Sequence, residues 1–134
     1  MDQRIHDSFD KQGLMTSLGA RIDSVDAGRV VISAPIRSET SQQHGFAHAG
    51  LTFALGDSAA GYSALTTMAE GAEVLTAEMK INLVAPADGA RLIATGEVIK
   101  PGRRLVVTRA TVETEYSDGA RKIVAVLQGT MVPV

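Results

Sequence analysis

The stretch from His48 to Met68 reads HAGLTFALGDSAAGYSALTTM, and it is the part of the chain that most constrains the fold. Between Gly45 and Ala69 the only formally charged residue is Asp57. Apolar residues recur at helical spacing, which predicts a helix from Ala49 to Met68. A membrane span made of small residues with a carboxylate at its centre would insert poorly, so we expect a helix buried in a globular protein.

One side of this helix is built to pack on a sheet. Leu51, Leu55, Tyr62 and Leu65 share that side, and we expect Tyr62 to belong to the core. Smaller residues and Asp57 occupy the neighbouring side, where another backbone or a ligand can come close.

Alternating apolar and polar residues predict antiparallel strands before and after the helix. The expected strands cover residues 20–25, 29–36, 74–84, 91–100, 104–116 and 121–132. Turn signals separate them at residues 26–28, 86–89 and 117–119, and Pro101-Gly102 suits the centre of a type II turn. A short helix over residues 2–12, ended by Gly13, would come first. The order of elements indicates an α+β layer.

Length and composition limit the class of protein. The 134 residues suit one domain, 1–134, and a net charge of -2 without a basic stripe gives no sign of nucleic-acid binding. The chain has no cysteine, which excludes disulfides and Cys-ligated metals. The polar N-terminal residues do not resemble a secretory signal, and we expect a cytoplasmic protein.

The predicted helix start is a candidate oxyanion hole. His48-Ala49-Gly50 opens the helix, so backbone N–H groups without intrahelical partners lie there, at the positive end of the helix dipole. Such amides can hold a carbonyl oxygen while negative charge develops on it. Gly50 has no side chain to block the approach.

Asp57 is the candidate base or nucleophile. It lies seven residues after Gly50, two helical turns along the same face. Burying a carboxylate among small apolar residues is costly unless it is solvated, paired or useful, and such a group can have a raised pKa. Gln42, in the loop before the helix, could position a water molecule or a carbonyl group.

These residues also have structural interpretations. Asp57 could cap a neighbouring loop, and His48 could serve only as a hydrogen-bonding residue at the helix start. His44, His48 and Asp57 could instead suggest a metal site. Both histidines precede the helix and need not face the same way, so we predict no metal.

The segment from His48 to Asp57 resembles the His-Gly-Gly…Asp/Glu helix start of the PaaI-like (phenylacetate-degradation-type) acyl-CoA thioesterases, and the spacing of nine is its most specific element. Residues 78–87, EMKINLVAPA, resemble the family's central strand and its closing Pro, and residues 96–104 resemble its next hairpin. The likeness covers the chain from Leu14 onward. It implies a hotdog fold, in which an antiparallel sheet of five to six strands wraps one long central helix.

The resemblance also implies roles for single residues. In this family the acid on the helix activates water or attacks the thioester directly, and Asp57 occupies its position. The N–H after the His holds the thioester oxygen, which assigns that role to Ala49, with Gly50 adjacent. A polar amide six residues before the His orients the nucleophile or the carbonyl, here Gln42. In some members a strand hydroxyl holds the water, and Thr76 matches it.

The resemblance further implies a site between two protomers, whose sheets join across a homodimer, commonly within a dimer-of-dimers tetramer. Ala49 replaces the first Gly of the family motif. This replacement suits the N–H role where the φ of Ala49 is negative, whereas a positive φ would cost about 1–2 kcal/mol. Cations suit the phosphates of CoA, and the candidates are Arg103, Arg104, Lys100 and Lys80.

The leading hypothesis is hydrolysis of an acyl-CoA to a carboxylic acid and free CoA. No cofactor is expected, since coenzyme A is part of the substrate. Two alternatives stay open. One is a hotdog hydratase or dehydratase that uses His48 and Asp57 as an acid–base pair. The other is a non-catalytic acyl-CoA-binding subunit that would not depend on Asp57.

Overall fold

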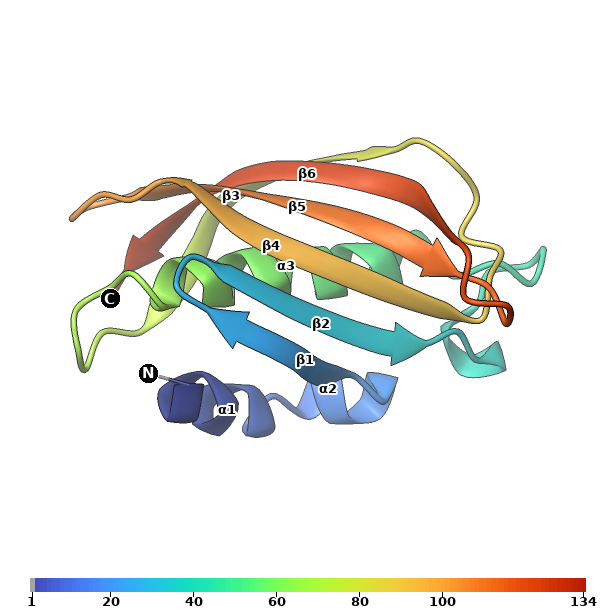
Figure 1. The fold of residues 1–134 in the computed structure, drawn as a ribbon, viewed down its shortest axis with the longest axis horizontal. Helices are drawn as coiled ribbons and strands as arrows, with labels where there is room; N and C mark the ends of the chain where they lie inside the picture. The colour runs from blue at the N-terminus through green and yellow to red at the C-terminus, as the bar shows by residue number, and fades with distance from the viewer. Residues whose placement is uncertain (1) are drawn as a thin grey trace.

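Six antiparallel strands form one sheet, and the longest helix lies across one face of it (Figure 1). The computed structural model describes residues 2–134. It confirms the expected hotdog arrangement of a long helix wrapped by a sheet. In chain order the elements are α1 (Asp2–Asp10), α2 (Gly13–Leu18), β1 (Arg21–Asp26), β2 (Arg29–Pro35), a 3-10 turn (Ser38–Thr40), α3 (Ala49–Leu65), β3 (Val74–Leu83), β4 (Arg91–Lys100), β5 (Val106–Glu115) and β6 (Arg121–Pro133).

The strand order corrects one expectation. We expected residues 86–89 to close a hairpin between the strands on either side of them. The sheet instead has the order β1-β2-β4-β5-β6-β3, so residues 84–90 carry the chain across the sheet. β3 pairs with β6, from Val74 opposite Pro133 to Leu83 opposite Ala125. β3 is therefore an edge strand, with one side unpaired within the described chain.

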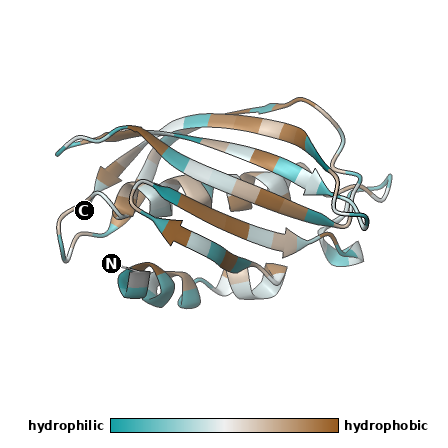
Figure 2. Cartoon of the chain, viewed as in Figure 1, coloured by the Kyte–Doolittle hydropathy of each residue, from teal (hydrophilic) through white to brown (hydrophobic). Residues whose placement is uncertain are grey.

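Helix α3 packs closely on the sheet. The predicted sheet-facing residues Leu51, Leu55, Tyr62 and Leu65 are each at most 3% exposed, which confirms their place in the core. At Gly96 of β4, an added Cβ would lie 2.2 Å from the carbonyl carbon and oxygen of Ala59. Glycine there lets β4 and α3 touch backbone to backbone. Figure 2 shows apolar residues alternating with polar ones along the strands.

The N-terminus holds two helices where one was expected. Ile5 and Phe9 are buried, as their spacing predicted, at 0% and 8% exposure. Gly13 does not end α1 but begins α2, which was missed. Gly19 caps the end of α2, and its φ of 66° allows its N–H to bond carbonyl oxygens of the preceding turn. With only six residues and a single buried side chain, Met15, α2 has too little periodicity to be recognised.

Two of the expected turns have the predicted geometry. Gly28 and Gly119 have positive φ, at 73° and 88°, in the hairpins β1–β2 and β5–β6. The type II turn at Pro101-Gly102 was wrong, because the φ of Gly102 is not positive. An added Cβ at Gly102 would lie 2.3 Å from the carbonyl oxygen of Leu105, so glycine is needed there for a close backbone approach.

No helix within residues 2–134 combines the length and the apolar character that crossing a membrane requires.

Candidate active site

Asp57 on α3 faces Thr76 on the edge strand β3. The Thr76 hydroxyl donates a hydrogen bond to Oδ1 of Asp57 over 2.7 Å, and it lies 3.3 Å from Sδ of Met131 on β6. Within residues 2–134 no hydrogen bond is formed to Oδ2 of Asp57. The structure therefore brings together two residues that the sequence singled out, and it leaves one carboxylate oxygen available.

Burial raises the pKa of Asp57 above the ordinary value of an aspartate, and the hydrogen bond from Thr76 lowers it in part. Among the described residues no Lys, Arg or His forms an ion pair with Asp57. A raised pKa makes the ionised carboxylate a stronger base, which suits it to take a proton from water.

A hollow of about 240 Å³ opens beside Asp57. Its walls come from the N-terminal segment, from α3, and from β3 and β6. The residues that line it include Ser8, Gln12, Asp57, Gly61, Tyr62, Thr76 and Met131. The sequence did not predict Ser8 and Gln12 at this hollow. Helical spacing indicated that one face of the N-terminal helix is buried, but it could not identify the element that covers this face.

His48 caps the start of α3. Its Nδ1 accepts a hydrogen bond from the N–H of Gly50 over 2.7 Å, and its backbone is extended. This contact is the structural role considered for His48, and it occupies the Gly50 amide. The N–H of Ala49 has no partner within residues 2–134. Among residues 2–134 only glycines have a positive φ. The φ of Ala49 is therefore not positive, which is the condition under which alanine suits the N–H role.

Gln42 lies near the helix start. It lines a groove of about 510 Å³ together with His48, Ala49 and Pro86. The side-chain oxygen of Gln42 accepts a hydrogen bond from the N–H of His44, so its amide NH2 remains to donate. An N–H donor of this kind can bond a carbonyl oxygen or a water molecule, and the role expected for Gln42 stays a prediction.

Ala49 and Asp57, the two candidate groups on α3, lie far apart along the helix. Ala49 and Asp57 are eight residues apart on α3, which corresponds to about 12 Å along the helix axis. They line separate hollows. Within one chain, the N–H of Ala49 and the carboxylate of Asp57 therefore do not face a common hollow.

Three of the four predicted CoA-binding cations lie together between β4 and β5. Lys100, Arg103 and Arg104 are exposed, and none of them forms an ion pair with another described residue. Arg103 lines a hollow of about 450 Å³ between this hairpin and the loop after α3. We call these three exposed residues of the β4–β5 hairpin the positive tip.

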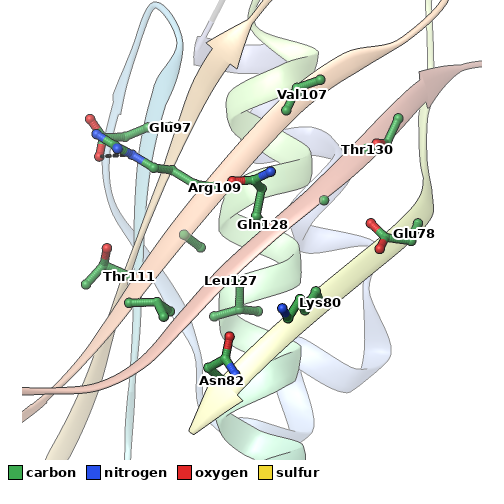
Figure 3. A pocket seen from close by; sticks show the side chains of 13 residues that line it. Glu78, Lys80, Asn82, Glu97, Val107, Arg109, Thr111, Leu127, Gln128 and Thr130 are labelled. Atoms are coloured by element: carbon green, nitrogen blue, oxygen red, sulfur yellow. Dashed lines mark ion pairs between the residues drawn. The ribbon is translucent and has the colours of Figure 1, made fainter. Parts of the chain in front are cut away.

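Lys80 lies elsewhere, on the face of the sheet opposite α3. It lines a hollow of about 700 Å³, and Figure 3 shows it beside Asn82 and Glu78, with α3 behind the sheet. An ion pair between Arg109 and Glu97 spans 3.6 Å in the same region. Within one protomer, Lys80 is therefore on the other side of the sheet from Asp57.

Two observations bear on the alternative interpretations of these residues. Within residues 2–134, no group of three or more His, Asp or Glu side chains is arranged to hold a metal ion. Asp57 does not cap a loop, because its hydrogen-bond partner is a side chain on β3.

Comparisons with known proteins agree on a single family. The thioesterase superfamily profile matches residues 44–118, more than half of the chain. A solved structure of a thioesterase family protein from Silicibacter pomeroyi is 43% identical, with a TM-score of 0.96 over 99% of this chain and 97% of that one. The 1,4-dihydroxy-2-naphthoyl-CoA hydrolase of Listeria monocytogenes is 25% identical over 89% of this chain and 94% of that protein.

One further structure supports the fold alone. The E. coli PaaI protein from the phenylacetic acid degradation operon is 22% identical, with a TM-score of 0.85 over 98% of this chain and 91% of that one. The profile match and the solved structures agree with the six-stranded sheet and its long helix. The chain belongs to the thioesterase superfamily, a family of thioester hydrolases, and has its hotdog fold.

Proposed function

We propose that this protein hydrolyses acyl-CoA thioesters to a carboxylic acid and free CoA, with Asp57 as the general base or nucleophile. The proposal rests on the surroundings of Asp57. It is the only charged residue on α3, it is half-buried with a raised pKa, and one of its oxygens is fixed by Thr76. The Listeria relative is named as the hydrolase of a CoA ester, which supports CoA as the thiol that carries the acyl group.

In the general-base form, Asp57 takes a proton from a water molecule, whose oxygen attacks the thioester carbonyl carbon. The carbonyl oxygen becomes negative and is stabilised by the N–H of Ala49 and the positive end of α3. The C–S bond then breaks and CoA leaves as a thiolate, a good leaving group that needs little acid assistance, and Asp57 passes its proton to the thiolate or to solvent. In the nucleophile form, a carboxylate oxygen of Asp57 attacks the thioester carbonyl carbon and the C–S bond breaks as CoA leaves as a thiolate. Water then hydrolyses the resulting anhydride to the free acid and restores the Asp57 carboxylate. The amide of Gln42 orients the carbonyl or the water in both forms.

We propose that the complete site forms across a homodimer. The separation of about 12 Å between Ala49 and Asp57 along α3 supports this arrangement, since a second protomer can bring its own helix start to Asp57. β3 is the natural joining edge, because its free side presents unpaired backbone groups, and Leu75 and Leu83 nearby are 57% and 55% exposed. A dimer-of-dimers tetramer and a cytoplasmic location stay predictions.

We assign the phosphates of CoA to the positive tip formed by Lys100, Arg103 and Arg104. Arginine binds phosphate oxygens with two donors at once, and the absence of internal ion pairs among the described residues leaves these donors available. Lys80, on the outer face, would contribute only from another protomer.

The test is steady-state hydrolysis of phenylacetyl-, benzoyl-, hydroxybenzoyl-, hexanoyl- and decanoyl-CoA, followed by release of the free thiol. Turnover that is lost in Asp57→Asn supports the proposal. Hydration of an enoyl-CoA without thiol release would instead identify a hydratase. A rise in Tm with CoA esters and no turnover would identify a binding subunit.

A further inference from the structure

Three side chains tie the crossover, residues 84–90 between β3 and β4, to the β5–β6 hairpin. The hydroxyl of Tyr116 donates a hydrogen bond to Oδ1 of Asp88 over 2.6 Å, and Nζ of Lys122 donates to the same oxygen over 3.2 Å. Nζ of Lys122 also lies 5.9 Å from the centre of the Tyr116 ring, within the range of a cation–π contact. We call Asp88, Tyr116 and Lys122 the crossover anchor.

The crossover contacts the segment that leads into α3. The carbonyl oxygen of Ala87 accepts a hydrogen bond from the N–H of Ala47 over 3.0 Å, and both residues are buried, at 7% and 8% exposure. Ala47 is two residues before Ala49, the candidate oxyanion donor. Ala47, Ala49, Pro86 and Ala87 line the same groove. In Figure 1 the crossover, the β5–β6 hairpin and the loop before α3 lie at the same end of the molecule.

Asp88 is the only residue of the crossover with a polar side chain. Backbone N–H groups of Val84, Gly89 and Ala90 hold the two ends of the crossover on β5 and β6. Within residues 2–134, no side chain of the crossover other than that of Asp88 forms a hydrogen bond. The crossover therefore depends on Asp88 for its side-chain attachment to the hairpin.

One peptide group joins the anchor to the start of α3. The carbonyl that receives the Ala47 N–H belongs to the peptide group between Ala87 and Asp88, which is planar and nearly rigid. The position of the Asp88 Cα therefore limits the direction in which this carbonyl can point. The bonds from Tyr116 and Lys122 hold the Asp88 side chain and, with it, that Cα. Release of Asp88 would free the carbonyl to turn away from Ala47.

We propose that Asp88 is a positioning residue, which keeps the N–H of Ala49 where negative charge develops on the thioester carbonyl oxygen. The inference rests on the proposed thioesterase function. Asp88 does not line the groove and acts through the Ala87 carbonyl and the Ala47 N–H. An oxyanion donor is effective at roughly 2.7–3.1 Å from the developing charge, so a small displacement of Ala49 lowers kcat.

A purely structural role makes a different prediction. If the anchor only stabilises the fold, its loss would lower Tm and leave kcat of the folded enzyme unchanged. The side chains of Asp88 and Lys122 are 34% and 40% exposed, and exposed ion pairs contribute little to stability. A positioning role lowers kcat while KM and Tm change little, because the donor acts on charge that is present only in the transition state.

The experiment measures kcat, KM and Tm with whichever of the five acyl-CoAs the wild type hydrolyses fastest. The variants are Asp88→Ala, Asp88→Asn, Tyr116→Phe and Lys122→Met. The matched control is Asp118→Ala, since Asp118 lies on the same hairpin but its Oδ1 accepts the N–H of Ala120 and not a group of the crossover. Asp88→Ala is also combined with Ala49→Pro, which removes the N–H of Ala49.

We expect Asp88→Ala to lower kcat by about tenfold with KM unchanged. Tyr116→Phe and Lys122→Met should each give part of that loss, and Asp118→Ala none. Asp88→Asn keeps an oxygen for the Tyr116 hydroxyl and should retain most of the rate. Asp88→Ala should cost nothing further in the Ala49→Pro background, because the donor that it positions is already gone.

Two results would overturn this inference alone. One is hydrolysis by the wild type with an unchanged kcat in Asp88→Ala, or in Tyr116→Phe where Asp88→Ala does not fold. The other is the same loss from Asp88→Ala with and without Ala49→Pro, which would mean that Asp88 acts on something other than Ala49. No hydrolysis of any ester by the wild type would overturn the proposed function and this inference with it.

Discussion

Asp57 works against folding at the pH where it is needed. Folding raises the pKa of Asp57, so the folded state binds its proton more tightly than the unfolded state. The favourable contribution is fully present below the ordinary pKa of an aspartate and is lost as pH rises through the raised pKa. Above that pH the buried ionised carboxylate costs stability.

The first prediction concerns Asp57→Asn. We expect turnover to fall by at least about 10²-fold, because the base is removed while the shape is kept. At neutral pH the Tm should equal or exceed that of the wild type, and the difference should shrink as pH falls through the raised pKa. Activity assays and thermal unfolding at several pH values check both parts. A variant that turns over at near the wild-type rate would remove Asp57 from the mechanism.

The second prediction concerns Thr76→Val, which keeps the shape and removes the hydroxyl. The hydrogen bond from Thr76 lowers the pKa of Asp57, so its loss should raise that pKa further. The acid limb of the pH–rate profile should then move to higher pH, with a several-fold lower rate near neutrality. An unmoved acid limb would mean that Thr76 does not act on the group that titrates.

The third prediction concerns Arg103 and Arg104. Replacing both with Ala should raise KM for an acyl-CoA by about tenfold, because each removes a charge-assisted bond to phosphate. KM for the matching acyl-pantetheine, which lacks the nucleotide phosphates, should hardly change. Equal effects on both substrates would place the phosphates elsewhere.

Residue types and spacing predicted part of the geometry of the candidate site. The charge of Asp57 within an otherwise uncharged helix, and the nine residues from His48, identified the carboxylate and the helix start. The sequence could not show that the His48 side chain would occupy the Gly50 amide, because that bond depends on a rotamer. It also grouped Lys80 with the other cations, whereas the register shift between Thr76 and Glu78 puts Lys80 on the face of the sheet opposite Thr76.

At the scale of elements, the contact between α3 and the sheet decides which small residues are replaceable. Gly96 of β4 touches the backbone of Ala59, whereas Gly61 of α3 faces the open hollow. The fourth prediction is that Gly96→Ala lowers the free energy of unfolding by about 3 kcal/mol, since backbone must move.

Gly61→Ala is the matched control within the same layer. It should leave stability unchanged or raise it by up to about 1 kcal/mol, because alanine favours the helix. Urea unfolding of both variants is the measurement. Equal effects of the two substitutions would contradict the close packing of β4 on α3.

Local patterns predicted the elements better than their arrangement. The pairing of β1 with β2 and of β5 with β6 was predicted correctly, because a glycine-containing turn joins the two strands of each pair directly. The pairing of β3 with β6 could not be read from the sequence, since its partners lie more than 40 residues apart along the chain. The short connection after β3 resembled a hairpin turn in the sequence, but it carries the chain across the sheet to β4, which does not pair with β3.

The whole molecule matters because the proposed site takes residues from two protomers. Ala49 offers the means to test this. It is the first residue of α3, where proline is well tolerated, and His48 before it already has the extended backbone that a following proline requires. Ala49→Pro therefore removes the proposed oxyanion donor without breaking a hydrogen bond found within residues 2–134. We expect a loss of about 10²–10³ in kcat with the fold intact.

The most direct test mixes two inactive variants, Asp57→Asn and Ala49→Pro, co-expressed in equal amounts, with hybrid dimers verified by native mass spectrometry. If each site takes Asp57 from one protomer and Ala49 from its partner, every hybrid dimer holds one intact site. The fifth prediction is then recovery of about a quarter of the wild-type activity, because half of the dimers are hybrids with half of their sites intact. A mixture that contains hybrids but stays as inactive as its parents would contradict a site shared between protomers.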